Sequence, residues 1–122
     1  MKSFLWCSVH QPTTEQLAEL SAQGDVQFLK ELNPQLQSSL NATPPDIMEL
    51  SKLAIELTEY GFKGYTLVQP GGSPAFLYMF GRANTETNFP VLFAHSERVS
   101  EDVPQEDGSV RKVSVFRHVC FF

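Results

Sequence analysis

The stretch Gly64-Tyr65-Thr66-Leu67-Val68-Gln69-Pro70-Gly71-Gly72-Ser73-Pro74 contains the pattern on which the fold prediction depends. Its first half is a short apolar run that indicates a buried strand, and Pro70-Gly71-Gly72 indicates a turn. Ser73 is a favourable N-cap and Pro74 suits the first position of a helix, so the pattern predicts a helix over 74–83. A strand, a glycine turn and a helix in this order are typical of a parallel sheet covered by helices.

The same alternation of strand and helix begins at the N-terminal side. An apolar run over residues 4–9 predicts a first strand. Thr13, with Gln16 three residues later, predicts a capping box that opens a short helix ending at Gly24. A brief second strand is expected over 26–29.

The middle of the chain contains one long helix and one irregular segment. Residues 33–45 are rich in Gln, Ser, Asn and Pro, so we expect a flexible loop there. Apolar residues spaced by three and four predict a helix from about Ile47 to Gly61, with Thr43 as a possible cap.

The C-terminal part is expected to complete the sheet. Residues 90–94 predict a fourth strand that ends at His95, and the Asp107-Gly108 turn introduces a last strand or strand pair over 110–122. We therefore predict an α/β fold: a single Rossmann-like domain over residues 1–122, with a mostly parallel central sheet flanked by helices and a C-terminal strand or hairpin. The helix over 74–83 is apolar nearly all round, which predicts that it lies under the sheet or meets another subunit.

Charge and length narrow the classes of function. The 122 residues include 14 Asp and Glu against 9 Lys and Arg, for a net charge of −5. This charge argues against a protein that binds duplex DNA or a membrane surface, since both are anionic. All four arginines lie in the second half of the chain, so a small anionic ligand is compatible with the charge.

Segments for targeting, membrane insertion or metal binding are not evident in the sequence. No apolar run reaches the ~18 residues of a membrane-spanning helix, and the N-terminus does not have the pattern of a signal peptide. Cys7 and Cys120 both lie in apolar, strand-like runs, which indicates buried free thiols in a reducing cytoplasm. No spacing of ligands predicts a metal site, and no cofactor is expected.

Polar side chains gather where three of the predicted strands end. The carboxyl ends of parallel strands lie along one edge of a sheet, and ligands bind there where the strand order reverses. We therefore expect these three stretches to line a single crevice. The stretches are His10-Gln11-Pro12-Thr13, Gln69-Pro70-Gly71-Gly72-Ser73 and His95-Ser96-Glu97-Arg98.

The glycine turn is the most informative of the three. Two glycines let a ligand approach the backbone, and the start of the next helix offers unpaired N–H groups that suit a phosphate. The turn contains neither the lysine of a Walker A loop nor a G-x-G-x-x-G fingerprint. A turn without a ligand is the alternative interpretation.

Each candidate side chain also has a structural interpretation. His10 either caps or turns the chain after the first strand, or it binds phosphate or moves a proton. His95 and Arg98 have the same two interpretations, and Arg98 can simply form a surface ion pair. Arg117 and His118 lie in a strand that is apolar on both faces, so one of the two is expected to point into a crevice or interface. A structural histidine is the more common outcome.

These residues give the sequence a resemblance to a known family. His10-Gln11-Pro12-Thr13-Thr14-Glu15-Gln16-Leu17, Pro70-Gly71-Gly72-Ser73-Pro74-Ala75, and the C-terminal part from His95 to Gly108 and from Val115 to Val119 resemble the small stand-alone ring nucleases of type III CRISPR systems. Those proteins resemble the CARF domains that sense nucleotides in CRISPR effectors. The resemblance covers most of the chain except about residues 30–45.

The resemblance implies a homodimer that binds a cyclic oligoadenylate, most often cyclic tetra-adenylate, and cleaves it without a metal into products with a 2′,3′-cyclic phosphate. This reaction switches off antiviral signalling. It implies that His10 transfers a proton, that Arg98 supplies positive charge, and that Gly71, Gly72 and Ser73 hold phosphate. The further ligand-binding residues would be Gln11, Thr13, Thr14, Gln69, His95, Ser96, Arg117 and His118.

Two other classes of function remain open at this point. The first is a protein of the same fold that sequesters the cyclic nucleotide without cleaving it. The second is a protein-interaction module whose apolar helix binds a larger partner and whose glycine turn has no ligand.

Overall fold

The fold is built around one five-stranded mixed sheet. The computed structural model describes residues 2–43, 45–87 and 89–122. The strands lie in the order β2-β1-β3-β4-β5, so the first strand of the chain is interior to the sheet. The three pairs formed by β1–β2, β1–β3 and β3–β4 are parallel, and β4–β5 is antiparallel. The strands are β1 (Lys2–Trp6), β2 (Gly24–Phe28), β3 (Thr66–Gln69), β4 (Val91–Pro104) and β5 (Val110–Phe121).

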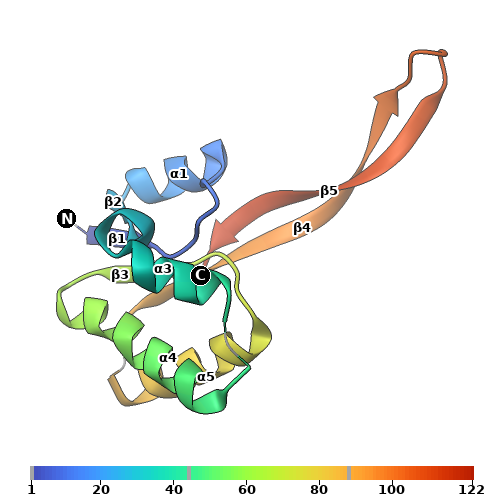
Figure 1. The fold of residues 1–122 in the computed structure, drawn as a ribbon. Coiled ribbons are helices and arrows are strands. Elements are labelled where there is room, and N and C mark those ends of the chain that lie inside the picture. Colours follow the sequence, from blue (N-terminus) through green and yellow to red (C-terminus); the bar gives the residue numbers. More distant parts are fainter. Residues whose placement is uncertain (1, 44, 88) are drawn as a thin grey trace.

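Helices cover both faces of the parallel part of the sheet (Figure 1). One face packs against α3, α4 and α5, and the other packs against α1. The helices are α1 (Thr14–Ser21), α2 (Leu29–Leu32), α3 (Pro34–Asn41), α4 (Ile47–Phe62) and α5 (Pro74–Thr87). No described helix is both long enough and apolar enough to cross a membrane.

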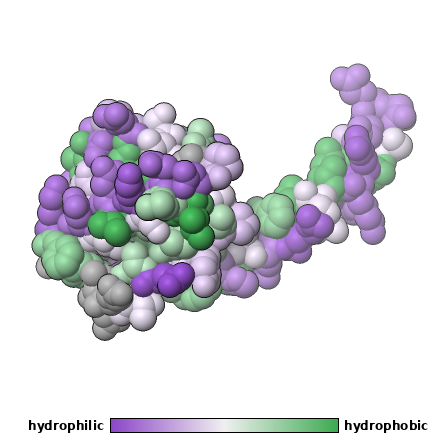
Figure 2. All heavy atoms as spheres, turned by 60° about the horizontal axis from the view of Figure 1, so that its bottom comes forward, coloured by the Kyte–Doolittle hydropathy of each residue, from purple (hydrophilic) through white to green (hydrophobic). Residues whose placement is uncertain are grey.

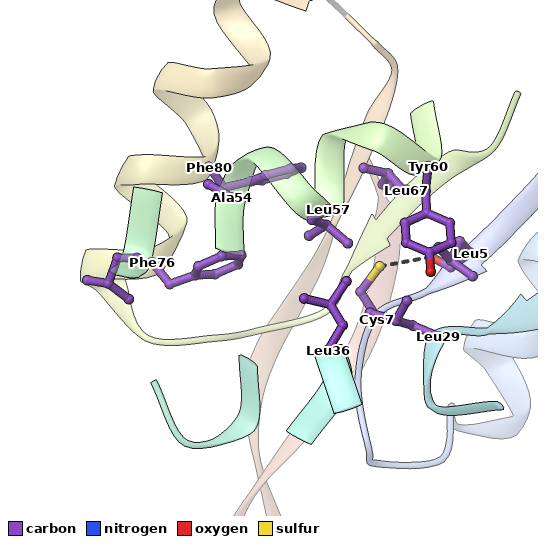
Figure 3. Packing of buried hydrophobic residues seen from close by; sticks show 11 residues of the cluster. Leu5, Cys7, Leu29, Leu36, Ala54, Leu57, Tyr60, Leu67, Phe76 and Phe80 are labelled. Carbon is purple, nitrogen blue, oxygen red and sulfur yellow. Dashed lines mark hydrogen bonds between the residues drawn. The ribbon is translucent and has the colours of Figure 1, made fainter. Parts of the chain in front are cut away.

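Alternation along β1 divides its side chains between the two faces. Successive residues of a strand point to opposite sides, so Leu5 and Cys7 join the core beneath α4 and α5, while Phe4 and Trp6 join the core beneath α1. Figure 3 shows the first of these cores, in which Leu5 and Cys7 meet side chains from the covering helices. A shift of one residue in the register would exchange the two sets, which fixes the position of β1.

Several local predictions are confirmed. Thr13 Oγ1 accepts from the Gln16 amide at 3.1 Å and Gln16 Oε1 accepts from the Thr13 amide at 2.9 Å, which completes the capping box of α1. Ser73 Oγ accepts from the Phe76 amide at 3.2 Å at the start of α5. The expected turn at residues 107–108 is present, with Gly108 at a φ of 84°.

The prediction of a flexible loop over 33–45 is wrong for most of its length. Residues 34–41 form α3, whose first turn is capped by Asn33, with Oδ1 accepting from the Leu36 amide at 3.1 Å. Pro34 at the first position fits such a start. Most of its polar residues lie on the exposed side of this short helix, whose Leu36 and Gln37 are buried.

The long helix α4 also starts differently from the prediction. Asp46, not Thr43, is its N-cap and accepts from the amides of Met48 and Glu49. Thr43 Oγ1 instead lies 3.4 Å from Ser73 Oγ. Pro44, the residue after Thr43, lies outside the described residues.

Burial of α5 is one-sided. Phe76 and Phe80 are almost fully buried in the core that α5 shares with α4, whereas Tyr78 is 64% exposed. The helix therefore packs under the sheet with one side, which is one of the two positions expected from the sequence. Its apolar character alone does not require a second subunit.

The fourth strand does not end at His95. It continues to Pro104 because β5 pairs with it in one register from Ser96 to the tip. We call residues 95–119 of this hairpin the arm. Figure 1 shows the arm as a two-stranded ribbon that projects away from the rest of the molecule.

Candidate functional site

The strand order reverses between β1 and β3. The chain passes from β1 to β2 on one side, then returns to place β3 on the other side of β1. The connections that leave β1 and β3 therefore diverge, and a crevice forms between the carboxyl ends of these two strands. Ligands of open α/β sheets bind at such a point.

A cavity of about 540 Å³ lies at this point. Its size is within the ~300–1,000 Å³ that is common for small-molecule sites. The lining residues come from the end of β1 and the segment after it, α1, the end of β3, the start of α5, and α3 with the segment after it. They are Trp6, Cys7, Ser8, His10, Gln11, Gln16, Gln37, Leu40, Asn41, Thr43, Gln69, Pro70, Gly71, Gly72, Ser73 and Phe76.

The lining is polar but nearly uncharged. It includes five carboxamide side chains, and none of these described lining residues is Lys, Arg, Asp or Glu. His10 is exposed at the rim. Burial raises the pKa of the Cys7 thiol to about 12, so Cys7 stays protonated and is not a nucleophile at neutral pH.

Two of the carboxamides are buried without a partner for their oxygen. Gln37 on α3 and Gln69 at the end of β3 are each 3% exposed. Within the described part of the chain, neither Oε1 atom has a hydrogen-bond partner. An unpaired buried acceptor costs about 1–3 kcal/mol. Both residues line the cavity, so a ligand that donates N–H or O–H groups would remove this cost.

Backbone groups at the start of α5 form another part of the cavity. Gly71, Gly72 and Ser73 lie between β3 and this fourteen-residue helix. A Cβ added to Gly71 would meet nothing within 4 Å, so the space beside this backbone is open. Gly72 has a φ of 151°, which favours glycine. The helix start adds a positive dipole end, which suits an anion.

The segment after β1 is fixed to the core. The Trp6 indole Nε1 donates to the His10 carbonyl oxygen at 2.8 Å, and the His10 amide donates to Ser8 Oγ at 3.2 Å. Trp6 is 1% exposed, so this contact joins the rim of the cavity to a rigid side chain. His10 and Gln11 therefore have a defined position at the cavity.

The structure brings together two of the three predicted strand ends. His10, Gln11, Gln69 and the Gly71–Ser73 turn line the same cavity. Thr13 and Thr14 do not line it; Thr13 caps α1, and Gln16 lines the cavity instead.

The third stretch, from His95 to Arg98, does not reach the cavity, because β4 continues through it into the arm. Arg98 lies 5.2 Å from the centre of the Phe116 ring. The exposed Ser96 is opposite His118 in the β4–β5 ladder, and His95 packs against the Phe122 ring. Arg117 forms an ion pair with Glu101 at 3.0 Å.

His118 has a structural position at the base of the arm. Its Nε2 lies 3.0 Å from Glu19 Oε1 on α1, and Glu19 Oε2 accepts from the Phe121 amide at 2.9 Å. The His118 side chain is 5% exposed and its ring packs against Phe121. Glu19 and His118 therefore attach β5 to α1.

This attachment predicts a pH effect. The hydrogen bond from the Phe121 amide, with a further contribution from His118, lowers the pKa of Glu19 below its ordinary value of 4.5. A lowered pKa in the folded state means that the stabilisation is complete above pH ~5 and is lost as the pH falls through the folded pKa. We expect the free energy of unfolding to fall less between pH 5 and pH 3 in Glu19→Gln than in the wild type. Identical pH profiles in urea titrations would contradict this role of Glu19.

Sequence reasoning missed Gln37, Asn41 and Thr43. All three lie in the segment for which a loop was expected. The pair Asn33-Pro34 is a helix start, and a helix from there places Gln37 beside Leu36 and Leu40 on one side. This signal in the sequence could have identified Gln37 as a buried polar residue.

The structure thus defines an α/β protein with a polar, amide-rich cavity where the strand order reverses. By sequence, the chain belongs to the MJ1673 family of uncharacterized proteins, whose family model matches residues 2–122. No curated protein and no solved structure matches the chain at a significant level.

Proposed function

We propose that this chain binds a cyclic oligoadenylate, most simply cyclic tetra-adenylate, with one nucleotide in the cavity between β1 and β3. The observation that favours a nucleotide is the pair of buried, unpartnered carboxamide oxygens of Gln37 and Gln69. A carboxamide offers a donor and an acceptor side by side, which matches the N6 and N7 edge of adenine. Gln11 at the rim supplies a further contact to base or ribose.

The phosphate of the same nucleotide would lie against Gly71, Gly72 and Ser73. The described lining offers no lysine or arginine, so the backbone N–H groups at the start of α5 would hold the phosphate. This arrangement suits one phosphate and not a long polyanion.

A cavity of about 540 Å³ is too small for a ring of four nucleotides. We propose that a homodimer supplies two such cavities to one ring. The strand order β2-β1-β3-β4, with parallel neighbours, supports the narrower assignment of a Rossmann-like, CARF-like domain. The free thiols of Cys7 and Cys120 are compatible with a reducing cytoplasmic setting.

Cleavage is the second part of the proposal, with the consequence of switching off type III CRISPR signalling. The ribose 2′-oxygen forms a bond to the adjacent phosphorus while the bond to the leaving 5′-oxygen breaks. The products are a 2′,3′-cyclic phosphate and a 5′-hydroxyl. His10 takes the proton of the 2′-hydroxyl or returns a proton to the leaving oxygen. The attacking group belongs to the substrate, so we assign no metal to this step.

A specific observation favours sequestration without cleavage as the second candidate. The described lining of the cavity has no lysine or arginine to stabilise the developing charge, and Arg98 and Arg117 are engaged on the arm. In that case the protein would lower the concentration of the cyclic nucleotide by binding alone. An interaction module without a ligand is the third candidate.

The three candidates give different results in one experiment. Excess cyclic tetra-adenylate is incubated with the protein in EDTA, and the products are separated by chromatography. The proposal predicts linear products over several turnovers, and a loss of ~10²–10⁴-fold in rate for His10→Ala with binding retained. The matched control is His95→Ala, which lies outside the cavity.

Each alternative outcome of this experiment points to a different conclusion. Binding without products identifies a sequestering protein. The absence of a thermal shift with any adenylate favours the interaction module. A full rate in His10→Ala removes His10 from the mechanism.

A further inference from the structure

The arm is the largest feature that the proposed ligand site does not use. Its two strands pair only with each other from Ser96 to the tip, and they extend away from the helices (Figure 1). A two-stranded ribbon of this kind is at best marginally stable in water unless something packs against it. We therefore expect the arm to be stabilised by a contact with another molecule.

One face of the arm contains a cluster of valines. Residues directly opposite each other in an antiparallel ladder point to the same side, and alternate residues of a strand share a side. Val99 is opposite Val115, and Val103 and Val113 lie on the same side in the neighbouring rows. We call this side the valine face. In Figure 2, hydrophobic residues interrupt the mostly hydrophilic surface of the projecting arm.

The charges on the valine face are balanced. The remaining positions of these rows are Glu97, Glu101, Arg111 and Arg117, two acidic and two basic residues. The opposite side of the ribbon carries two basic residues and one acidic residue, Arg98, Lys112 and Asp102. Its exposed apolar residues, Phe116 and Val110, are separated by Ser100 and Ser114.

A second copy of this chain is the partner that these charges fit. In a two-fold symmetric contact the same patch meets itself, so it must offer both signs of charge. The valine face satisfies this condition. Residues 2–90 contain nine acidic and five basic side chains, so contacts between the bodies of two copies start from repulsion.

We infer that the arm is a dimerisation element whose valine face packs against the valine face of a second copy. The inference concerns the homodimer that the proposed function needs, but it is tested without any ligand. A negative result in the dimerisation test therefore does not bear on the proposed ligand site. A negative result in ligand binding does not bear on the arm contact.

The size of the arm sets the expected strength of this contact. The two strands of the arm form nine paired rows from Ser96 to Pro104. With ~3.4 Å of length per row and a ribbon width of ~10 Å, each face has an area of roughly 300 Å². This area is below the ~800 Å² per partner of a standard interface, so we expect a dissociation constant on the order of micromolar or weaker. A ring bound by both subunits would strengthen it by mass action.

Sedimentation velocity tests the inference. Protein concentrations from about 1 to about 500 µM span the dissociation constant expected for so small an interface. We expect a concentration-dependent dimer in the wild type and a dissociation constant at least ~10-fold weaker in Val115→Glu. The matched control is Ser114→Glu, on the same strand but on the opposite side, which we expect to leave the dimer unchanged. Circular dichroism shows whether each variant is folded.

A cross-linking measurement keeps the test decisive if Val115→Glu fails to fold. In a Cys120→Ser background, Val115→Cys should give covalent dimers with a short bismaleimide, and Ser114→Cys should give far fewer. A monomer at every concentration, equal weakening by both glutamates, or equal cross-linking by both cysteines would each overturn the inference.

Discussion

Replacing Trp6 by alanine is expected to lower the free energy of unfolding by about 3–5 kcal/mol. The indole is 1% exposed, meets the Phe121 ring edge-on at 6.3 Å, and donates to the His10 carbonyl oxygen. Alanine would leave a cavity in the core beneath α1 and would release the rim of the ligand cavity. Because a domain of this size has only about 5–15 kcal/mol of stability, this loss would affect a large part of it.

Two further variants separate the causes of this loss. Trp6→Phe keeps most of the packing and removes the hydrogen bond, which is worth about 1 kcal/mol. Phe116→Ala removes an aromatic ring that is 72% exposed on the arm, and we expect a change within ~0.5 kcal/mol. Because Trp6 is the only tryptophan, urea unfolding has to be followed by circular dichroism. Equal losses in Trp6→Ala and Phe116→Ala would contradict the assignment of Trp6 to the core.

Replacing Gln69 by leucine is expected to change stability and affinity in opposite directions. Leucine is similar in size and has no acceptor to leave unpaired, so the ligand-free protein should become more stable by about 1 kcal/mol. The affinity for cyclic tetra-adenylate should fall at least ~10-fold, equivalent to about 1.4 kcal/mol, because the contact to the base is lost. Gln37→Leu should behave in the same way.

The control for this pair is Gln11→Leu. Gln11 also lines the cavity but is exposed, so the substitution should leave stability nearly unchanged. Stability is measured by urea unfolding, and affinity by calorimetry in a His10→Ala background to prevent turnover. A less stable Gln69→Leu protein with unchanged affinity would show that the carboxamide supports the fold and not a ligand.

The parts of the fold that depend on neighbouring residues could be predicted from the sequence. The capping box of Thr13 and Gln16 and the Ser73-Pro74 helix start are satisfied within one turn, so a short stretch contains all the information. The same is true of the turn at Gly108. Because two of the strand ends adjoin such helix starts, half of the cavity could also be located in advance.

The parts of the fold that depend on residues distant in the sequence could not be predicted in this way. Whether β4 ends at His95 or continues depends on its pairing with β5, and the polar residues after Ala94 are compatible with a solvated ribbon. Burial of Gln37 depends on the packing of α3 over the ends of β1 and β3. An amide-rich segment gives no indication of such packing unless the Asn33-Pro34 helix start is recognised.

The central claim is that the cavity between β1 and β3 binds a nucleotide. Titration of isotope-labelled His10→Ala protein with cyclic tetra-adenylate, followed by amide chemical shifts in NMR, tests it most directly. We expect the largest shifts at Gly71, Gly72 and Ser73 and in the side-chain amides of Gln37 and Gln69. No shifts at saturating ligand would contradict the claim. Shifts confined to the arm, or to the groove between α4 and α5 near Ile55 and Phe62, would contradict it equally.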